Sequence, residues 1–374
     1  MTNIPVGIKA IAVSFPSGVR TNDYWKENYP QMVQEAEEKN LAKLFSASGS
    51  TPSNEFSKAM IPYLKDPFRG SIERRVLGSG ESSLTLEYRA AKEALEAANL
   101  SPNQLDLMLV ASIFPEEIAP GNAAFLAHKL GFLGAAWNIE STCSSALVAL
   151  QSAYAMVQAG LYCNVLVVVS NTYTRFADEK DTFSWFLGDG AGAVVVSQLK
   201  ANQGILGTKI LNTGNTCGAF FNEFTVDEQS NVRMWIRAGK DAGQALSNSS
   251  EFIRTCCQGA VSAAGLTLDQ IKFFAFNTPT AWYADVCANV LNIDPQRIIN
   301  LNPKYANIGA AFPFVNLYHA AESGRIREND LVVVYTLGTS SSAGAMVMRW
   351  GEVALGPVPA SSQSQIKVAL TTGI

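Results

Sequence analysis

Histidine is almost missing from this sequence, whose 374 residues include only His128 and His319. Because histidine is the usual general base at neutral pH, the chain has few candidate residues for acid–base catalysis. The six cysteines include no Cys-x-x-Cys pair, and two of them, Cys256 and Cys257, are adjacent. This spacing excludes the common zinc and redox motifs, and we expect no metal site.

Charge and long apolar runs are also scarce. Charged residues make up 16% of the chain, the net charge is -4, and no polybasic run occurs, which argues against binding to nucleic acid or to an anionic membrane. No apolar stretch approaches the ~20 residues that a membrane-spanning helix requires. Residues Met1 to Ala10 lack the charged-then-apolar profile of a signal peptide, so we expect a cytoplasmic protein.

The sequence does contain a repeated alternation of apolar runs and amphipathic helical stretches. Uninterrupted apolar runs of this length are typical of strands buried on both faces, in sheets covered by helices. The pattern predicts an α/β protein. The predicted strands are Leu105–Ile113, Val165–Ser170, Ala193–Ser197, Phe273–Phe276 and Leu331–Thr336, and the clearest helices are Leu84–Asn99 and Ala242–Ala264.

Two segments about half the chain apart resemble each other. ALEAANLSPNQLDLMLVAS in the first half and AVSAAGLTLDQIKFFAFNT in the second each read as a helix, a short connection and a strand. Such self-similarity indicates an internal duplication. We place an N-terminal half at residues 1–200, a C-terminal half at 201–352, and a tail rich in Pro, Ser and Gln at 353–374, which we expect to be loose.

A polar segment at about residues 23–69 is inserted in the first half. It contains QEAEEKNLAKLF, the pattern of a charged amphipathic helix, followed by a loop signal from Ser46 to Pro52. Two interpretations stay open. The helix is a solvated surface element, or it is a lid over a substrate channel.

The most informative motif is NIESTCSSALVALQSAYAMVQAG, residues 138–160, in which small residues surround Cys143. Leu147, Leu150, Tyr154 and Val157 follow at helical spacing, so Cys143 stands at the start of a buried helix. There the helix dipole stabilises a thiolate and free backbone N–H groups can hold an oxyanion, as a cysteine nucleophile requires. A buried structural cysteine at a tight helix start is the alternative.

Cys143 belongs to a series of motifs that runs along most of the chain. The series comprises Val6–Asn22, Ile72–Arg75, Pro120–Gly131, Cys143 with its helix, Phe186–Ala193, Asn307–Ala311 and Gly338–Trp350. In this order the motifs resemble the beta-ketoacyl-acyl carrier protein synthase III family of the thiolase superfamily. FLGDGAGA resembles that family's Phe-Gly-Asp-Gly-Ala-Gly-Ala signature with Leu187 as an extra residue, and NIGAA resembles its Gly-Asn-Thr-Ser-Ala segment.

The resemblance implies a thiolase fold, in which two duplicated βαβαβαββ halves form a five-layer α-β-α-β-α arrangement. It also implies that Cys143 is the acylated nucleophile and that the Asn307 amide helps to bind the thioester oxygen. The backbone N–H groups of Cys143 and of the Gly338-Thr339 turn would form the oxyanion hole. Gly188, Gly190 and Gly192 would allow close backbone packing behind the site. No cofactor is implied, since acyl-CoA or the phosphopantetheine of an acyl carrier protein is a substrate.

One departure from the family concerns its catalytic histidine, which follows the second-half strand in a Pro-His segment. Here that strand runs into Asn277-Thr278-Pro279-Thr280, and we place the histidine position at Thr280, with Asn277 as an alternative three residues upstream. His128 and His319 match no family position. Since a threonine hydroxyl cannot replace imidazole as a base, we expect Cys143 to be acylated but malonyl decarboxylation to be slow or absent.

A second departure concerns the acyl donor. The family holds the adenine of coenzyme A between a tryptophan and an arginine, and those places fall near Lys65 and Asp181 here, although Arg69 nearby matches a family arginine. We therefore expect carrier-bound acyl groups to be better donors than free acyl-CoA. Besides Arg69, we expect Asn277, Glu116 and Glu117 to contact the substrate.

The resemblance implies an acyltransferase in fatty-acid-like or specialised-metabolite biosynthesis, with a malonyl unit, an amine, an alcohol or an acidic carbon as acceptor. The alternative is a catalytically weakened partner subunit of a heterodimeric ketosynthase. The family also implies a homodimer, in which the segment Ile113–Ala119 reaches the partner's acyl pocket. Glu116 or Glu117 would then act as a base there, unless both are solvated surface charges.

Overall fold

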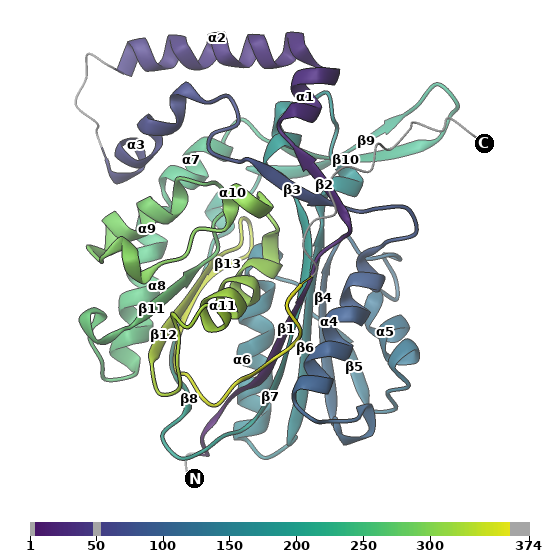
Figure 1. The fold of residues 1–374 in the computed structure, drawn as a ribbon, viewed down its shortest axis with the longest axis vertical. Coiled ribbons are helices and arrows are strands. Elements are labelled where there is room, and N and C mark those ends of the chain that lie inside the picture. Colours follow the sequence, from purple (N-terminus) through teal and green to yellow (C-terminus); the bar gives the residue numbers. More distant parts are fainter. Residues whose placement is uncertain (1–3, 48–53, 360–374) are drawn as a thin grey trace.

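The protein is built in layers around two β-sheets (Figure 1). A computed structural model describes residues 4–47 and 54–359, and all structural statements below concern these residues. The predicted loop from Ser46 to Pro52 lies mostly outside the described residues, as does the end of the tail. None of the described helices is both long and apolar enough to cross a membrane.

The first sheet mixes parallel and antiparallel strands. Its central strand β6 is apolar on both faces, because Val165, Val167 and Val169 point to one core while Leu166 and Val168 point to another. This alternation accounts for the uninterrupted apolar run in the sequence. In spatial order the strands are β14 (Ala354–Leu355), β1 (Val6–Ser14), β7 (Asp189–Gln198), β6 (Asn164–Thr172), β4 (Leu107–Ile113) and β5 (Ala135–Asn138).

The second sheet repeats the scheme. Along β12, Val332 and Val334 face the core between the sheets, while Val333 and Tyr335 face outward to a separate core. Its strands, in spatial order, are β11 (Phe273–Phe276), β12 (Leu331–Leu337), β13 (Ser342–Arg349) and β8 (Gly204–Asn212). The apolar runs predicted as strands all form strands, with ends shifted by a few residues.

Three helical layers complete the fold (Figure 1). The helices α6 (Ser145–Gln158) and α11 (Phe312–Glu322) pack between the two sheets. The outer face of the first sheet is covered by α4 (Ser83–Ala97) and α5 (Asn122–Leu130), and that of the second by α8 (Ser249–Ala263) and α9 (Tyr283–Leu291). The predicted five-layer α-β-α-β-α order is therefore confirmed.

Two details of the sequence prediction need correction. The single helix predicted from Ala242 to Ala264 is two helices, α7 (Ala242–Ser247) and α8, which meet at Asn248. Asn and Ser favour helix ends because their side chains bond nearby backbone, and here the buried Ser249 hydroxyl donates to the Leu246 carbonyl at 2.6 Å. The tail is not loose at its start, since β14 pairs with β1 and the Gly356 N–H donates to the Ile11 carbonyl at 2.8 Å.

The inserted segment lies across one end of the molecule (Figure 1). Its long helix is α2 (Pro30–Ala47), as the charged amphipathic pattern predicts. Trp25 of the preceding helix, Phe68 and Trp185 pack together beneath it, with the Phe68 and Trp185 ring centres 4.6 Å apart. The other elements here are β2 (Gly18–Thr21), α1 (Asp23–Asn28), α3 (Glu55–Met60), the 3-10 helix η1 (Ile61–Lys65) and β3 (Glu73–Val76).

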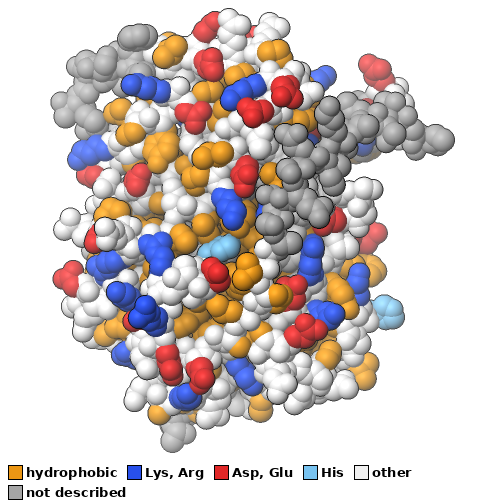
Figure 2. Space-filling view, viewed as in Figure 1, with side chains coloured by type: hydrophobic (Ala, Val, Ile, Leu, Met, Phe, Trp, Pro, Cys, Tyr) orange, Lys and Arg blue, Asp and Glu red, His pale blue; other side chains and the backbone are white. Residues whose placement is uncertain are grey.

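The remaining elements connect the layers. A two-stranded hairpin of β9 (Phe220–Val226) and β10 (Val232–Ala238) projects from the body (Figure 1). On the face drawn in Figure 2, acidic and basic side chains are interspersed, in keeping with the small net charge. The short helices that matter for the site are η3 (Thr142–Ser144), η4 (Tyr173–Phe176), η5 (Thr182–Phe186), α10 (Asn302–Tyr305) and η9 (Gly309–Ala311).

Candidate active site

Cys143 occupies the middle of η3, which leads directly into α6 between the two sheets. The turn is held by small hydroxyl side chains: Ser145 Oγ accepts from the Ser141 N–H at 2.8 Å, and Ser144 Oγ donates to the Ser342 carbonyl at 2.6 Å. Thr142 has a φ of 49°, which is rare for a β-branched residue. Strained backbone of this kind collects at functional sites, where the surrounding contacts enforce it.

The Cys143 thiol is subject to opposing influences. Burial raises its pKa, whereas the Tyr173 hydroxyl and the backbone N–H of Cys143 itself favour the thiolate. The N-terminus of the 14-residue helix α6 favours the negative charge as well. Cys143 as a residue is partly exposed. The site therefore holds a thiol whose ionisation depends on hydrogen-bond donors.

Tyr173 places a polar group beside the nucleophile, and sequence reasoning missed it. Its hydroxyl lies 3.4 Å from Cys143 Sγ. Tyr173 begins η4, immediately after β6. The available signal was its place, because a polar residue that directly follows a buried strand lies at the sheet edge where sites of α/β proteins gather.

The structure brings Asn277, rather than Thr280, to the backbone of Cys143. Asn277 follows β11 directly, is buried, and donates its Nδ2 to the Gly309 carbonyl at 3.0 Å and weakly to the Cys143 carbonyl at 3.5 Å. The Thr280 hydroxyl has no hydrogen-bond partner among the described residues and lines a cavity beneath α2. We therefore propose Asn277 for the position that the histidine holds in the family.

The backbone of Asn307 is hydrogen-bonded to the glycine-rich signature on both sides of Leu187. Its N–H donates to the Phe186 carbonyl at 2.8 Å, and its carbonyl accepts from the Gly188 N–H at 3.0 Å. Gly188 must lack a side chain here, because a Cβ would lie 2.1 Å from the Tyr305 carbonyl oxygen. Asn307 Oδ1 accepts from the Gly309 N–H at 2.9 Å, which leaves the amide Nδ2 as the donor for a substrate oxygen.

The expected oxyanion hole has one donor fewer than the sequence predicts. The Gly338 N–H donates to the Ser342 carbonyl at 2.8 Å, so it is already engaged. The turn still packs directly on η3, since a Cβ at Gly338 would lie 2.4 Å from Thr142 Oγ1. The N–H groups of Cys143 and Thr339 remain as the two candidate donors.

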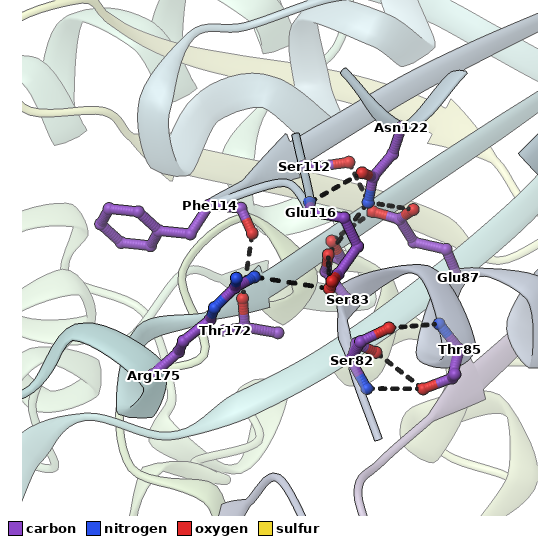
Figure 3. Close-up of polar contacts among 11 residues, drawn as sticks. Ser82, Ser83, Thr85, Glu87, Ser112, Phe114, Glu116, Asn122, Thr172 and Arg175 are labelled. Carbon is purple, nitrogen blue, oxygen red and sulfur yellow. Dashed lines mark hydrogen bonds and ion pairs between the residues drawn. The ribbon is translucent and has the colours of Figure 1, made fainter. Parts of the chain in front are cut away.

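Glu116 faces a buried polar network within its own chain (Figure 3). Its carboxylate accepts from the Ser83 hydroxyl at 3.3 Å and pairs with Arg175 at 3.5 Å. The network continues to Glu87, a fully buried carboxyl group that accepts from Asn122 Nδ2 at 2.8 Å and from the Ser112 and Ser170 hydroxyls. Burial raises the pKa of Glu87 to about 7. Glu117, by contrast, is exposed on the neighbouring loop.

A cavity of about 390 Å³ lies between α2 and the body of the protein. Arg69 lines it and bonds the Asn40 side chain of α2. Of the two open interpretations of the inserted helix, this arrangement favours a lid. The cavity is lined by Met32, Glu35, Ala36, Lys39, Asn40, Met60, Pro67, Arg69, Thr182, Trp185, Phe186, Thr280 and Trp282.

The two positions that align with the tryptophan and the arginine around adenine in the family are Lys65 and Asp181, so this chain has neither side chain there. Lys65 ends η1, and the Asp181 carboxylate pairs with Arg237 at 3.2 Å. Among the two histidines, the His319 ring lies 3.1 Å from the Tyr305 hydroxyl, and burial lowers its pKa to about 4, so it is a neutral structural group. No cluster of His, Cys, Asp or Glu side chains suited to a metal occurs in the described part of the chain.

Comparison with known proteins shows what the chain is similar to. Profiles of 3-oxoacyl-(acyl-carrier-protein) synthase III and of its C-terminal domain match residues 137–214 and 261–350. The beta-ketoacyl-(acyl-carrier-protein) synthase III of Brucella suis is 28% identical over 291 residues, covering 75% of this chain and 88% of its own. The Agrobacterium fabrum protein of the same name is similar to the same extent. The chain is similar to the synthase III family across both matched regions.

Solved structures agree on the fold. The synthase III of Aquifex aeolicus superimposes with a TM-score of 0.75 at 24% identity, over 92% of this chain and 100% of its own. The priming β-ketosynthase of the R1128 polyketide pathway gives 0.76 at 18% identity, over 93% and 97%. The two synthase III profiles cover the site: Cys143 and Tyr173 lie in the first matched region, and Asn277, Asn307 and the turn at Gly338 in the second.

Proposed function

We propose that this protein is an acyltransferase of the ketoacyl synthase III type, which takes an acyl group from an acyl carrier protein or coenzyme A thioester onto Cys143 and passes it to an acceptor. One observation carries the proposal. Cys143, a partly exposed residue, lies in η3 just before α6, and the turn at Gly338 packs directly on η3; this supports a nucleophile with nearby backbone donors for the thioester oxygen.

The chemistry of loading follows from these groups. Cys143 sulfur attacks the thioester carbon, and the N–H groups of Cys143 and Thr339 stabilise the oxyanion that forms. The carrier thiol then leaves, and the acyl group stays on Cys143. Asn307 Nδ2 is proposed to donate to the substrate oxygen in the transfer step. The proposed pathway is fatty-acid-like or specialised-metabolite biosynthesis.

We propose a carrier protein as the preferred donor. The curated relatives are named acyl-carrier-protein synthases. With Lys65 and Asp181 in place of a tryptophan and an arginine, the chain lacks the side chains that stack on adenine in the family. Arg69 and Lys39, which line the cavity under α2, are suited to bind the phosphate of a phosphopantetheine arm. Single-turnover loading of the same acyl chain from carrier protein and from coenzyme A tests this. Faster loading from coenzyme A contradicts the preference, and no loading from either contradicts the function.

We propose further that the active unit is a homodimer. The strand β5 is an edge of the first sheet; its Trp137 is 43% exposed, and Leu133 just before it is 92% exposed. Ile118, on the loop that carries Glu116 and Glu117, is 92% exposed too. Exposed edge strands and apolar side chains are unfavourable in water, so a second copy that covers them is the physical expectation. In the dimer Glu117 would reach the partner's acyl pocket.

A further inference from the structure

Tyr173 differs from the other residues near Cys143 because nothing said so far explains why its hydroxyl points at the sulfur. The side chain is 7% exposed, and its hydroxyl lies 3.4 Å from Cys143 Sγ. Cys143 Sγ is the only hydrogen-bond partner of this hydroxyl within the described residues. Buried phenol groups normally have a partner, so the contact with sulfur explains the position of the hydroxyl.

The backbone and ring of Tyr173 are held by contacts other than the one with Cys143. The next residue, Thr174, donates its N–H at 2.9 Å and its hydroxyl to the buried carboxylate of Asp189. The Tyr173 ring packs edge-on against Phe114, with ring centres 5.9 Å apart. Asp189 is the aspartate of the glycine-rich signature, so this motif positions the tyrosine.

The opposite wall leaves room for the hydroxyl. Gly309 has a φ of 52°, and a Cβ built on it would lie 3.1 Å from the Tyr173 oxygen and 2.7 Å from Asn171 Oδ1. Contacts that close force neighbouring atoms to move. The family segment quoted above has a serine at this place, so the glycine and the tyrosine hydroxyl fit together in this chain.

We propose that Tyr173 is a catalytic residue, whose hydroxyl donates a hydrogen bond to the Cys143 sulfur and stabilises it as a thiolate when it attacks the donor and when it leaves the acyl group. This rests on the proposed function. In loading, the S–C bond to Cys143 forms, the donor's C–S bond breaks, and the thiol proton of Cys143 ends on the released carrier thiol. In transfer, the acceptor's nucleophilic atom bonds the acyl carbon while the bond from that carbon to Cys143 sulfur breaks. The Cys143 thiolate then takes up the proton that the acceptor loses or, where a malonyl acceptor loses carbon dioxide instead, a proton from solvent.

Tyr173 acts as a donor throughout and does not itself become a base. Burial raises the pKa of Tyr173 well above its usual value, so the phenol keeps its proton while the thiol ionises. A hydrogen bond to an ionised partner is stronger than one to a neutral partner, so the hydroxyl favours the thiolate over the thiol. This is the help that a site without imidazole needs for sulfur chemistry.

The experiment is the pH dependence of Cys143 alkylation by iodoacetamide in the full-length protein, followed by mass spectrometry of the peptide that contains Cys143. Tyr173→Phe keeps the ring and removes the hydroxyl. We expect the apparent pKa of the thiol to rise by about one unit, which means about tenfold less thiolate below that pKa. Tyr318→Phe removes a distant hydroxyl, bonded to the Gly356 carbonyl at 3.0 Å, and should leave the profile unchanged.

A Tyr173→Phe profile that overlays the native one, or a Tyr318→Phe profile displaced equally, overturns the proposal. If Tyr173→Phe does not fold, the native sequence made with 3-fluorotyrosine gives the answer, because a more acidic phenol is a stronger donor and should shift the profile to lower pH. No shift in that protein also overturns the proposal. Alkylation requires no acyl donor, so failure of acyl loading is a separate result that bears on the proposed function.

Discussion

Asn277 Nδ2 lies 3.0 Å from the Gly309 carbonyl and 3.5 Å from the Cys143 carbonyl. The first contact engages one of its two protons, and the second is at the limit of hydrogen bonding. An enolate oxygen formed beside Cys143 would thus receive a weak donor from Asn277 and a second from Asn307. These two donors therefore stabilise only poorly the enolate that decarboxylation of a malonyl thioester would form.

We predict that replacing Asn277 by histidine increases carbon dioxide release from malonyl thioester by at least about tenfold, because an imidazole is a stronger donor at that place. Thr280→His is the matched control, since Thr280 lines the outer cavity, and should have a smaller effect. Release of carbon dioxide is measured directly with carboxyl-labelled substrate. If Thr280→His increases carbon dioxide release more than Asn277→His does, Thr280 and not Asn277 occupies the position of the family's histidine.

The lid interpretation predicts a binding defect when Arg69 is removed. Arg69 lines the cavity and bonds Asn40 of α2, so Arg69→Met should raise the KM for a carrier-bound donor by about tenfold and change kcat little. Lys92→Met, at an exposed side chain of α4 that does not line the cavity, is the matched loss of one positive charge. Equal effects of the two substitutions in steady-state kinetics would show that only overall charge matters.

Glu87 predicts a pH dependence of stability. Its pKa is raised from 4.5 to about 7 by burial, so the folded protein binds a proton that the unfolded chain has lost between these values. Protonated Glu87 therefore adds on the order of 3 kcal/mol to the free energy of unfolding below pH 4.5, and this stabilisation is lost as the pH rises to about 7. Glu87→Gln cannot titrate, so its free energy of unfolding should fall less between pH 5 and 8 than that of the native protein. Denaturant unfolding at several pH values measures both, and parallel curves would contradict the assignment.

The fold was predictable because its strands are apolar on both faces and its helices amphipathic, patterns that are visible in the sequence. Cys143 and Asn307 were recognisable from local motifs. Tyr173 was missed, and the choice between Thr280 and Asn277 stayed open, because the contacts of Tyr173 and Asn277 join segments far apart in the chain. The Gly338 N–H is engaged by Ser342, a turn contact that the residue types alone do not specify.

The homodimer prediction concerns β5 and the loop beside it. Trp137→Glu replaces an exposed apolar side chain at the sheet edge by a charged one, and we expect it to shift the protein toward monomer in sedimentation velocity. Glu116→Gln with Glu117→Gln should lower the rate of acyl transfer if one of them serves the partner's site. A native protein that sediments as a stable monomer refutes the dimer, and full activity of the double variant refutes the base.

The central claim is that Cys143 carries the acyl group. Intact-protein mass spectrometry after incubation with a panel of acyl carrier protein and coenzyme A thioesters tests it most directly. We predict a gain of one acyl group per chain, mapped to the peptide that contains Cys143, and no gain in Cys143→Ala. A Cys143→Ala variant that still gains the acyl mass, or a native protein that gains none from any donor, would contradict the account.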